Sequence, residues 1–271
     1  MEMRIAICLF GNLRTYDYCC ESFRQCLSDL NDADVFIHTW NTLNHNTKTW
    51  HKNKAKNGNV EINNIKDEII SAYGPSSMLI ENQCAVGSGE AIFMNRAISI
   101  DGIRFMIESI CRSNEQRINY ELKNNTKYDY ILFTRPDILF RRNVVIKDIL
   151  DQADQPENSI FFACNPKGHT LMLHEMGCQD LLFFAHHSVV EKFIKNKDEF
   201  LDSFVPGQIY PFGPEYYFIR FFYKLGFAEV PLNYLYGRDF EIVRLGDKRI
   251  CNQCNVSFID KIKCCIKKFV A

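Results

Sequence analysis

Short apolar runs alternate along this sequence with longer segments whose apolar residues recur at helical spacing. The run 131–133 has the length and composition of a buried strand. The segment 100–122 carries isoleucine at positions 100, 103, 107 and 110, on one face of a helix. Such alternation is typical of an α/β domain with a largely parallel sheet. The other expected strands are 4–10, 34–40, 78–80, 159–164 and 228–230, and the other expected helices are 18–30, 62–73, 188–204 and 215–225.

The composition supports one folded domain without a preference for nucleic acid. The chain has 271 residues and is 46% hydrophobic, which is enough for one sizeable core. With 32 basic and 33 acidic residues the net charge is −1, so no overall field attracts nucleic acid, and none is expected as a partner. Since no repeat or linker is evident, we expect one domain over residues 1–250.

The two ends of the chain bear on where the protein acts. The first apolar run, 5–10, is too short for the core of a signal peptide, and no stretch approaches the roughly 18 apolar residues of a membrane span. We therefore expect a cytoplasmic protein. The segment 251–271 is different, because apolar residues at helical spacing alternate there with lysines. It is either a basic amphipathic tail that makes peripheral contact with the inner face of a membrane, or a helix docked on the domain.

The sequence Thr134-Arg135-Pro136-Asp137 interrupts the apolar stretch 128–140. Pro136 cannot donate to a sheet ladder, so regular pairing should stop near it. Arg135 and Asp137 then lie at the end of the strand, where open α/β sheets bind ligands. A cation and a carboxylate at this spacing suit a metal-bound diphosphate. A surface ion pair that follows a core strand is the plainer alternative.

Polar residues also follow the first two expected strands. Gly11 allows the backbone to approach a ligand, and Arg14 can bind phosphate through two nitrogens. Neither the P-loop spacing nor GxGxxG is present at 11–15. After the second strand, His38 and Trp40 could hydrogen-bond to and stack on a base or sugar, although packing is the commoner role of such residues. The candidate donor-binding residues are Gly11, Asn12, Arg14, Thr15, His38, Trp40, Arg135 and Asp137.

Two carboxylates are candidates for acid–base chemistry. Asp180 stands between a loop and a wholly apolar run, where it could act as a general base or orient an acceptor hydroxyl. Glu215 follows Gly213-Pro214 at an expected helix start, where the helix dipole favours a carboxylate whatever its function. A turn or helix cap is the structural alternative for Asp180. Arg238 and Arg244, late in the chain, could close over a diphosphate.

Taken together, these segments resemble a family of glycosyltransferases from bacterial surface-polysaccharide gene clusters, of the capsule and O-antigen type. The matching segments are 4–15, 34–40 and 128–140, with looser echoes at Gln179-Asp180 and Pro214-Glu215. They occur in the family's order and cover most of residues 1–245. The resemblance implies a single GT-A-like domain, which is a Rossmann-like fold of nucleotide-diphospho-sugar transferases with a mostly parallel central sheet.

The resemblance also implies a nucleoside-diphosphate sugar donor and a divalent cation. In GT-A folds an Asp-X-Asp motif holds Mn²⁺ or Mg²⁺ on the donor diphosphate. Here Arg135-Pro136-Asp137 takes its place, so Asp137 is the expected metal ligand and the first Asp is missing. One carboxylate, diphosphate oxygens and waters can still hold Mg²⁺. Alternatively, Arg135 takes over part of the charge-neutralising role of the metal.

The sequence therefore predicts a glycosyltransferase that moves a sugar to a hydroxyl of a glycan or lipid-linked glycan. In an inverting reaction Asp180, or failing it Glu215, would deprotonate the acceptor. Two rival functions remain at this level. One is a sugar nucleotidyltransferase, although the Gly-rich first loop usual in that class is not evident at 11–15. The other is a non-catalytic assembly protein with a degenerate glycosyltransferase fold, which the missing Asp favours.

Overall fold

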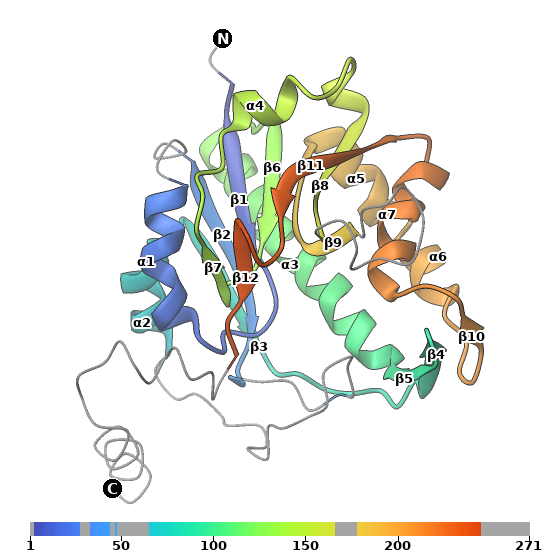
Figure 1. Cartoon of the computed structure of the whole chain (residues 1–271). Helices are drawn as coiled ribbons and strands as arrows, with labels where there is room; N and C mark the ends of the chain where they lie inside the picture. The colour runs from blue at the N-terminus through green and yellow to red at the C-terminus, as the bar shows by residue number, and fades with distance from the viewer. Residues whose placement is uncertain (1–2, 28–32, 44–46, 48–64, 166–177, 245–271) are drawn as a thin grey trace, which may run out of the picture.

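A seven-stranded sheet organises the computed structural model, which describes residues 3–27, 33–43, 47, 65–165 and 178–244 (Figure 1). The strand order is β11-β8-β9-β6-β1-β2-β3, and β9 alone of these strands runs antiparallel to its neighbours. The strands are β1 (Ile5–Leu9), β2 (Asp34–Trp40), β3 (Ser77–Glu81), β6 (Tyr130–Thr134), β8 (Ser159–Cys164), β9 (Cys178–His186) and β11 (Ala228–Leu235). The predicted fold class, α/β with a mostly parallel central sheet, is confirmed.

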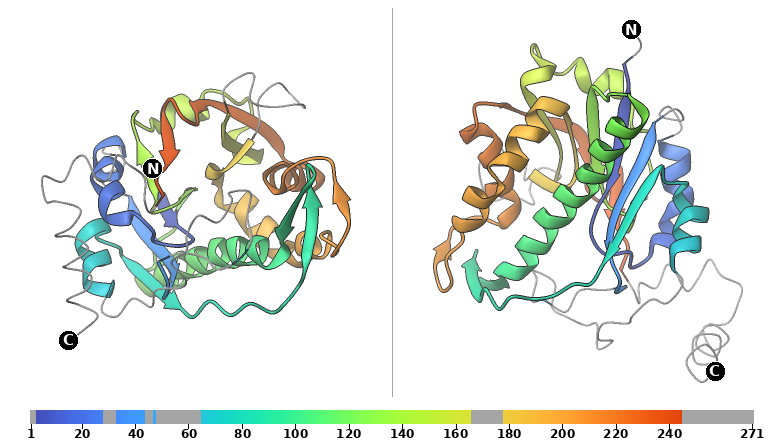
Figure 2. Two further views of the ribbon diagram at one scale, coloured as in Figure 1. Left: turned by 60° about the horizontal axis from the view of Figure 1, so that its bottom comes forward. Right: turned by 180° about the vertical axis from the view of Figure 1, so that it is seen from behind.

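Helices cover both faces of this sheet (Figure 2). One face packs against α1 (Tyr16–Cys26), α2 (Ile65–Tyr73) and α4 (Ile146–Leu150). The other packs against α3 (Ile100–Asn124), α5 (His187–Lys195), α6 (Lys197–Asp202) and α7 (Pro214–Lys224). Side chains alternate along each strand, so Cys8 and Phe133 enter the second core, whereas Leu9 and Leu132 enter the first. Burial on both faces explains why the strands read as continuous apolar runs.

The strand order reverses direction between β1 and β6. From β1 the chain builds outward through β2 to β3, and β6 then pairs on the opposite side of β1. In open α/β sheets, ligands bind outside the carboxyl ends of strands at such a reversal. β6 ends at Thr134, so the pairing stops before Pro136 as predicted. The segments 11–15 and 135–137 therefore leave the sheet side by side.

Two small sheets lie outside the predicted elements. β4 (Glu90–Phe93) and β5 (Arg96–Ser99) form a hairpin, which pairs with β10 (Ile209–Tyr210). Met94 and Asn95 both have positive φ in its two-residue turn, and this geometry usually selects Asn-Gly rather than Met-Asn. β7 (Ile138–Phe140) pairs with β12 (Phe240–Ile242), which lies beside it in Figure 1. Runs of two to four residues are too short to show a period.

Other differences from the predicted elements are small. The expected helix 188–204 is two helices, α5 and α6, which meet at Asn196. Asp180 lies inside β9 rather than at a turn or helix cap. A short 3₁₀ helix, Pro156–Asn158, precedes β8. The tail 251–271 lies outside the described residues, so the tail and the domain bounds remain predictions. None of the described helices combines the length and hydrophobicity that crossing a membrane requires.

Candidate active site

Asp137 forms the centre of a buried ionic cluster just beyond the end of β6. Its side chain has no exposed surface. Arg135 donates to both carboxylate oxygens, from Nε at 2.9 Å and from a terminal nitrogen at 2.7 Å. Arg14, from the turn after β1, donates to Oδ2 at 2.5 Å. The sequence-predicted residues Arg14, Arg135 and Asp137 are thus brought together, although 123 positions separate Arg14 from Asp137.

The carboxylate of Asp137 is held in its charged form. Burial alone would raise its pKa, but the guanidinium groups of Arg135 and Arg14 outweigh that effect and lower the pKa to about 2. The pKa of the Arg14 guanidinium is lowered to about 10, because the effect of burial outweighs the attraction of Asp137. Asp137 and the two arginines therefore all stay charged, because no proton passes from an arginine to the carboxylate.

A third arginine reaches the cluster from the late part of the chain. The backbone N–H of Val243 donates to Asp137 O at 3.0 Å, and the Thr15 hydroxyl donates to Val243 O at 2.7 Å. These bonds bring the next residue, Arg244, to the cluster, where burial and then Arg135 lower the pKa of its guanidinium. Thr15, a predicted donor-binding residue, therefore ties the late segment to the first turn.

Asp180 lies beside Arg135 on the antiparallel strand β9. Burial raises the pKa of its carboxyl group, and Arg135 opposes the shift only in part. A carboxylate with a raised pKa next to a cationic site is suited to accept a proton near neutral pH. The side chain of Tyr236 lies near Arg135 and Arg244. No pattern in the sequence around Tyr236 predicted this.

The turn at 11–15 has backbone features that suit a ligand site. Gly11 has a φ of 95°, which glycine adopts without strain, and Arg14 has a φ of 47°, which is uncommon for a side chain of its size. Backbone strain of this kind gathers at functional sites. Asn12 is 7% exposed, and its amide nitrogen has no hydrogen-bond partner among the described residues. Buried donors of this kind are normally satisfied by a ligand or by water.

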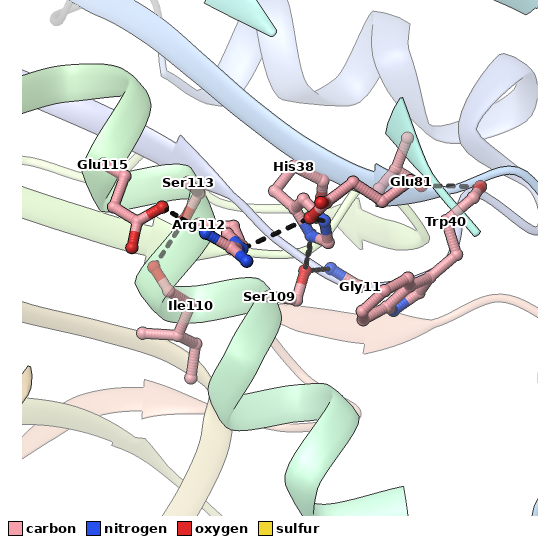
Figure 3. Close-up of polar contacts among 10 residues, drawn as sticks. Gly11, His38, Trp40, Glu81, Ser109, Ile110, Arg112, Ser113 and Glu115 are labelled. Atoms are coloured by element: carbon pink, nitrogen blue, oxygen red, sulfur yellow. Dashed lines mark hydrogen bonds and ion pairs between the residues drawn. The ribbon is translucent and has the colours of Figure 1, made fainter. Parts of the chain in front are cut away.

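His38 and Trp40 lie in the core against α3 (Figure 3). The ring of Trp40 packs edge-on against His38, with centroids 4.7 Å apart, and against Phe105 at 5.4 Å. Burial and the nearby Arg112 lower the pKa of His38 to about 3, so the imidazole is neutral. For His38 or Trp40 to contact a sugar-nucleotide donor directly, as the sequence predicts, the α3 residues that cover that side chain would first have to move away.

His38 instead belongs to a chain of hydrogen bonds that ends at the first turn (Figure 3). Glu81 can only accept, so His38 Nε2 carries the proton and donates to it at 3.1 Å. Nδ1 then accepts from the Ser109 hydroxyl at 2.7 Å, and Ser109 Oγ accepts from Gly11 N at 2.7 Å. Arg112 pairs with the same Glu81 oxygen at 3.3 Å. α3 thereby holds the Gly11 turn in place.

Replacement of Ser109 by alanine should destabilise the protein by about 1–3 kcal/mol, because the partly buried Gly11 N–H loses its acceptor and the buried His38 Nδ1 loses its donor. Ser113 is an equally buried serine on the same helix, whose hydroxyl donates to Ile110 O within the helix. Ser113→Ala should therefore cost less than about 1 kcal/mol. Chemical denaturation of both variants measures the difference. Equal losses would show that the bond to Gly11 contributes nothing beyond helix packing.

The remaining sequence candidates are Glu215 and Arg238. Glu215 is in the first turn of α7, whose apolar residues pack on the α3 face of the sheet. Arg238 pairs with Asp239 at 2.6 Å, and its side chain is 51% exposed. Of the two late arginines, Arg244 reaches the cluster and Arg238 does not.

The donor set around Asp137 does not fit a protein-held divalent ion. Guanidinium nitrogens contact both of its oxygens and use three of the about four lone-pair positions of a carboxylate. A cation at the roughly 2.1 Å that Mg²⁺ requires would stand against these positive groups. The described residues also contain no group of three or more His, Cys, Asp or Glu side chains placed to hold a metal. No catalytic step is therefore derived through a metal.

Comparison with known proteins finds only distant structural similarity. No protein-family model matches the sequence, and no curated protein sequence matches it. A nucleoside-diphosphate-sugar pyrophosphorylase from Vibrio cholerae RC9 is similar in structure with a TM-score of 0.45 and 11% identity, over 91% of this chain and 98% of that one. A glycosyltransferase involved in glycosylation of the major capsid of PBCV-1 gives 0.42 and 10%, over 93% and 100%. Likeness at this level assigns neither an activity nor site residues.

Proposed function

We propose that the protein is a glycosyltransferase that uses a nucleoside-diphosphate sugar and transfers the sugar to a hydroxyl of a glycan or lipid-linked glycan. The observation that carries the proposal is the cluster of Arg14, Arg135 and Arg244 around Asp137 at the strand-order reversal. Clustered guanidinium groups are the usual protein partners of phosphate oxygens. The resemblance of segments 4–15, 34–40 and 128–140 to bacterial surface-polysaccharide glycosyltransferases supports the same substrate class.

The chemistry requires the leaving diphosphate to be stabilised as its charge develops. In our proposal an acceptor hydroxyl attacks the anomeric carbon, the bond from that carbon to the diphosphate oxygen breaks, and the bonding electrons leave with the diphosphate. Arg14, Arg135 and Arg244 would stabilise the negative charge that develops on the leaving diphosphate. The proton of the hydroxyl would pass to the carboxylate of Asp180, whose raised pKa makes it a competent base. The buried side-chain amide of Asn12 would donate a hydrogen bond to an oxygen of the nucleotide sugar.

A screen of nucleotide sugars tests the proposal directly. The full chain is incubated with each donor and a panel of glycan acceptors, and the release of free nucleoside diphosphate is measured together with the glycosylated product. Release that depends on acceptor supports transfer. Formation of pyrophosphate from a nucleoside triphosphate and a sugar 1-phosphate, without transfer, would assign the protein to the nucleotidyltransferases instead. Absence of both activities across the panel would favour a non-catalytic assembly role.

Asp180→Asn should lower the rate of transfer by about 10²–10⁴-fold while the affinity for donor changes little, since only the proton acceptor is lost. The carboxyl pKa is raised, so the wild-type rate should fall as the pH drops toward that raised value, before an ordinary carboxylate would protonate. Steady-state kinetics across pH measures both effects. Glu215→Gln is the comparison variant. A larger loss in Glu215→Gln than in Asp180→Asn would transfer the role of base to Glu215.

A further inference from the structure

We propose that the diphosphate is neutralised by Arg14, Arg135 and Arg244 without a protein-bound divalent ion, and that Asp137 orients these arginines rather than ligating a metal. This inference rests on the proposed function for the identity of the ligand. It reverses the role that the sequence motif suggests for Asp137. It also gives Arg244, which lies far in the sequence from the segments 11–15 and 135–137, a direct part in binding.

The geometry of Asp137 is that of an arginine-orienting carboxylate. Arg135 contacts it through two nitrogens in the parallel fork arrangement, which fixes the plane of the guanidinium group. Arg14 reaches the same carboxylate from the neighbouring strand end. The side chain of Asp137 is fully buried, so no face of it is presented to solvent where a hydrated ion could be captured. A guanidinium group has five N–H donors, and Arg135 uses two of them on Asp137.

The charges of the described residues favour an anion rather than a cation. Arg14, Arg135 and Arg244 repel one another around the carboxylate of Asp137. Even when Asp180, the other acid beside Arg135, is ionised, three guanidinium groups face two carboxylates. Added positive charge would increase this repulsion, whereas a diphosphate would relieve it. Guanidinium groups also match phosphate oxygens in pairs, which a single ammonium does not.

Equilibrium binding without turnover tests the proposal. The full chain is stripped with EDTA, and the affinities of inorganic pyrophosphate, UDP and GDP are measured by calorimetry in EDTA and again with Mn²⁺ or Mg²⁺. We expect at least one probe to bind in EDTA, with an affinity within about threefold of that measured with metal. Binding should weaken as salt is added, because the attraction is ionic. Binding that appears only when metal is present would overturn the proposal.

Two arginine variants separate the cluster from general surface charge. Arg244→Gln should weaken binding of the same probe roughly tenfold or more, the effect of losing one charge-assisted contact. Arg244→Lys keeps the positive charge but loses the paired N–H donors of the guanidinium group. Its affinity for the probe should therefore lie between those of the wild type and Arg244→Gln. Arg238→Gln is the matched control, since Arg238 is an exposed arginine in the same part of the chain, and its affinity should match the wild type. Equal affinity in Arg244→Gln and wild type would remove Arg244 from the site.

The two proposals fail in different ways. Metal-independent binding of pyrophosphate or a nucleoside diphosphate, without transfer from any donor, would leave the arginine site standing and refute the glycosyltransferase. Transfer that is abolished by EDTA together with binding would confirm the glycosyltransferase and refute the arginine mechanism. Equilibrium dialysis of the full chain with Mn²⁺, without a diphosphate that would itself chelate the ion, gives an independent measure, for which we expect no stoichiometric retention of metal by the protein. Failure of every probe to bind would refute the arginine site.

Discussion

Asp137→Asn is expected to destabilise the folded protein by about 3–5 kcal/mol, the usual result of removing one partner from a buried ion pair. The substitution is nearly isosteric, so the loss comes from charge rather than from shape. Arg135 and Arg14 would remain close together without the anion that holds them. Such a loss is a large part of the 5–15 kcal/mol that stabilises a typical domain. Thermal and chemical denaturation in phosphate-free buffer measures it.

Asp239→Asn is the matched control for Asp137→Asn. Asp239 is also buried, with 5% exposure, and it also pairs with two arginines. Its partners, Arg142 and Arg238, are about half exposed, so water can solvate them when the carboxylate is removed. We expect a loss of roughly 1 kcal/mol. A similar loss in both variants would contradict the view that burial of the arginines makes Asp137 special.

The second large effect expected is a loss of stability in mild acid caused by His38. In the unfolded chain the imidazole protonates near pH 6.5, whereas in the folded protein burial and Arg112 lower its pKa to about 3. Between these values the unfolded state binds more protons, so stability falls as the pH falls. The slope from this one group approaches about 1.4 kcal/mol per pH unit. The effect is absent above pH 6.5 and saturates near pH 3.

Chemical denaturation of wild type and His38→Gln between pH 7.5 and 4.5 measures this contribution. The glutamine amide can still donate to Glu81 but does not titrate. His38→Gln is expected to be less stable than wild type at pH 7.5 and to lose less stability on acidification. Asp137 contributes little above pH 4.5 because it protonates only near pH 2, and the other carboxyl groups titrate in both proteins, so the difference between the two profiles isolates His38. Parallel pH profiles for the two proteins would refute the assignment to His38.

The parts of the site that the sequence predicted share one physical origin. Arg14 and Arg135 each follow a buried strand, and strands of that kind can be recognised in a sequence by their continuous apolar composition. The carboxyl ends of neighbouring parallel strands lie at one edge of the sheet, so their contact with Asp137 follows from topology. What local pattern could not settle was whether the acid would face a metal or the arginines, because that depends on side-chain geometry.

The rest depended on contacts between distant residues. Arg244 reaches the cluster because β12, three residues long, pairs with β7 about a hundred positions earlier, and no periodicity marks either strand. His38 and Trp40 lie within β2, as the expected strand 34–40 has them, yet α3 covers them, since Ser109 and Phe105 contact them from that helix. The hairpin of β4 and β5 escaped prediction because its turn places Met94 in a left-handed conformation.

The bonds from Val243 to Thr15 and Asp137 have a consequence for how the protein is made. Thr15 and Val243 are 228 positions apart, so the contact between them spans almost the whole described chain. On the ribosome, β1, β2 and the helix between them emerge early, but Arg14 and Asp137 stay without the segment that carries Arg244 until synthesis has passed position 244. The arginine cluster around Asp137 is therefore incomplete in the nascent chain, and late contacts of this range make folding slow.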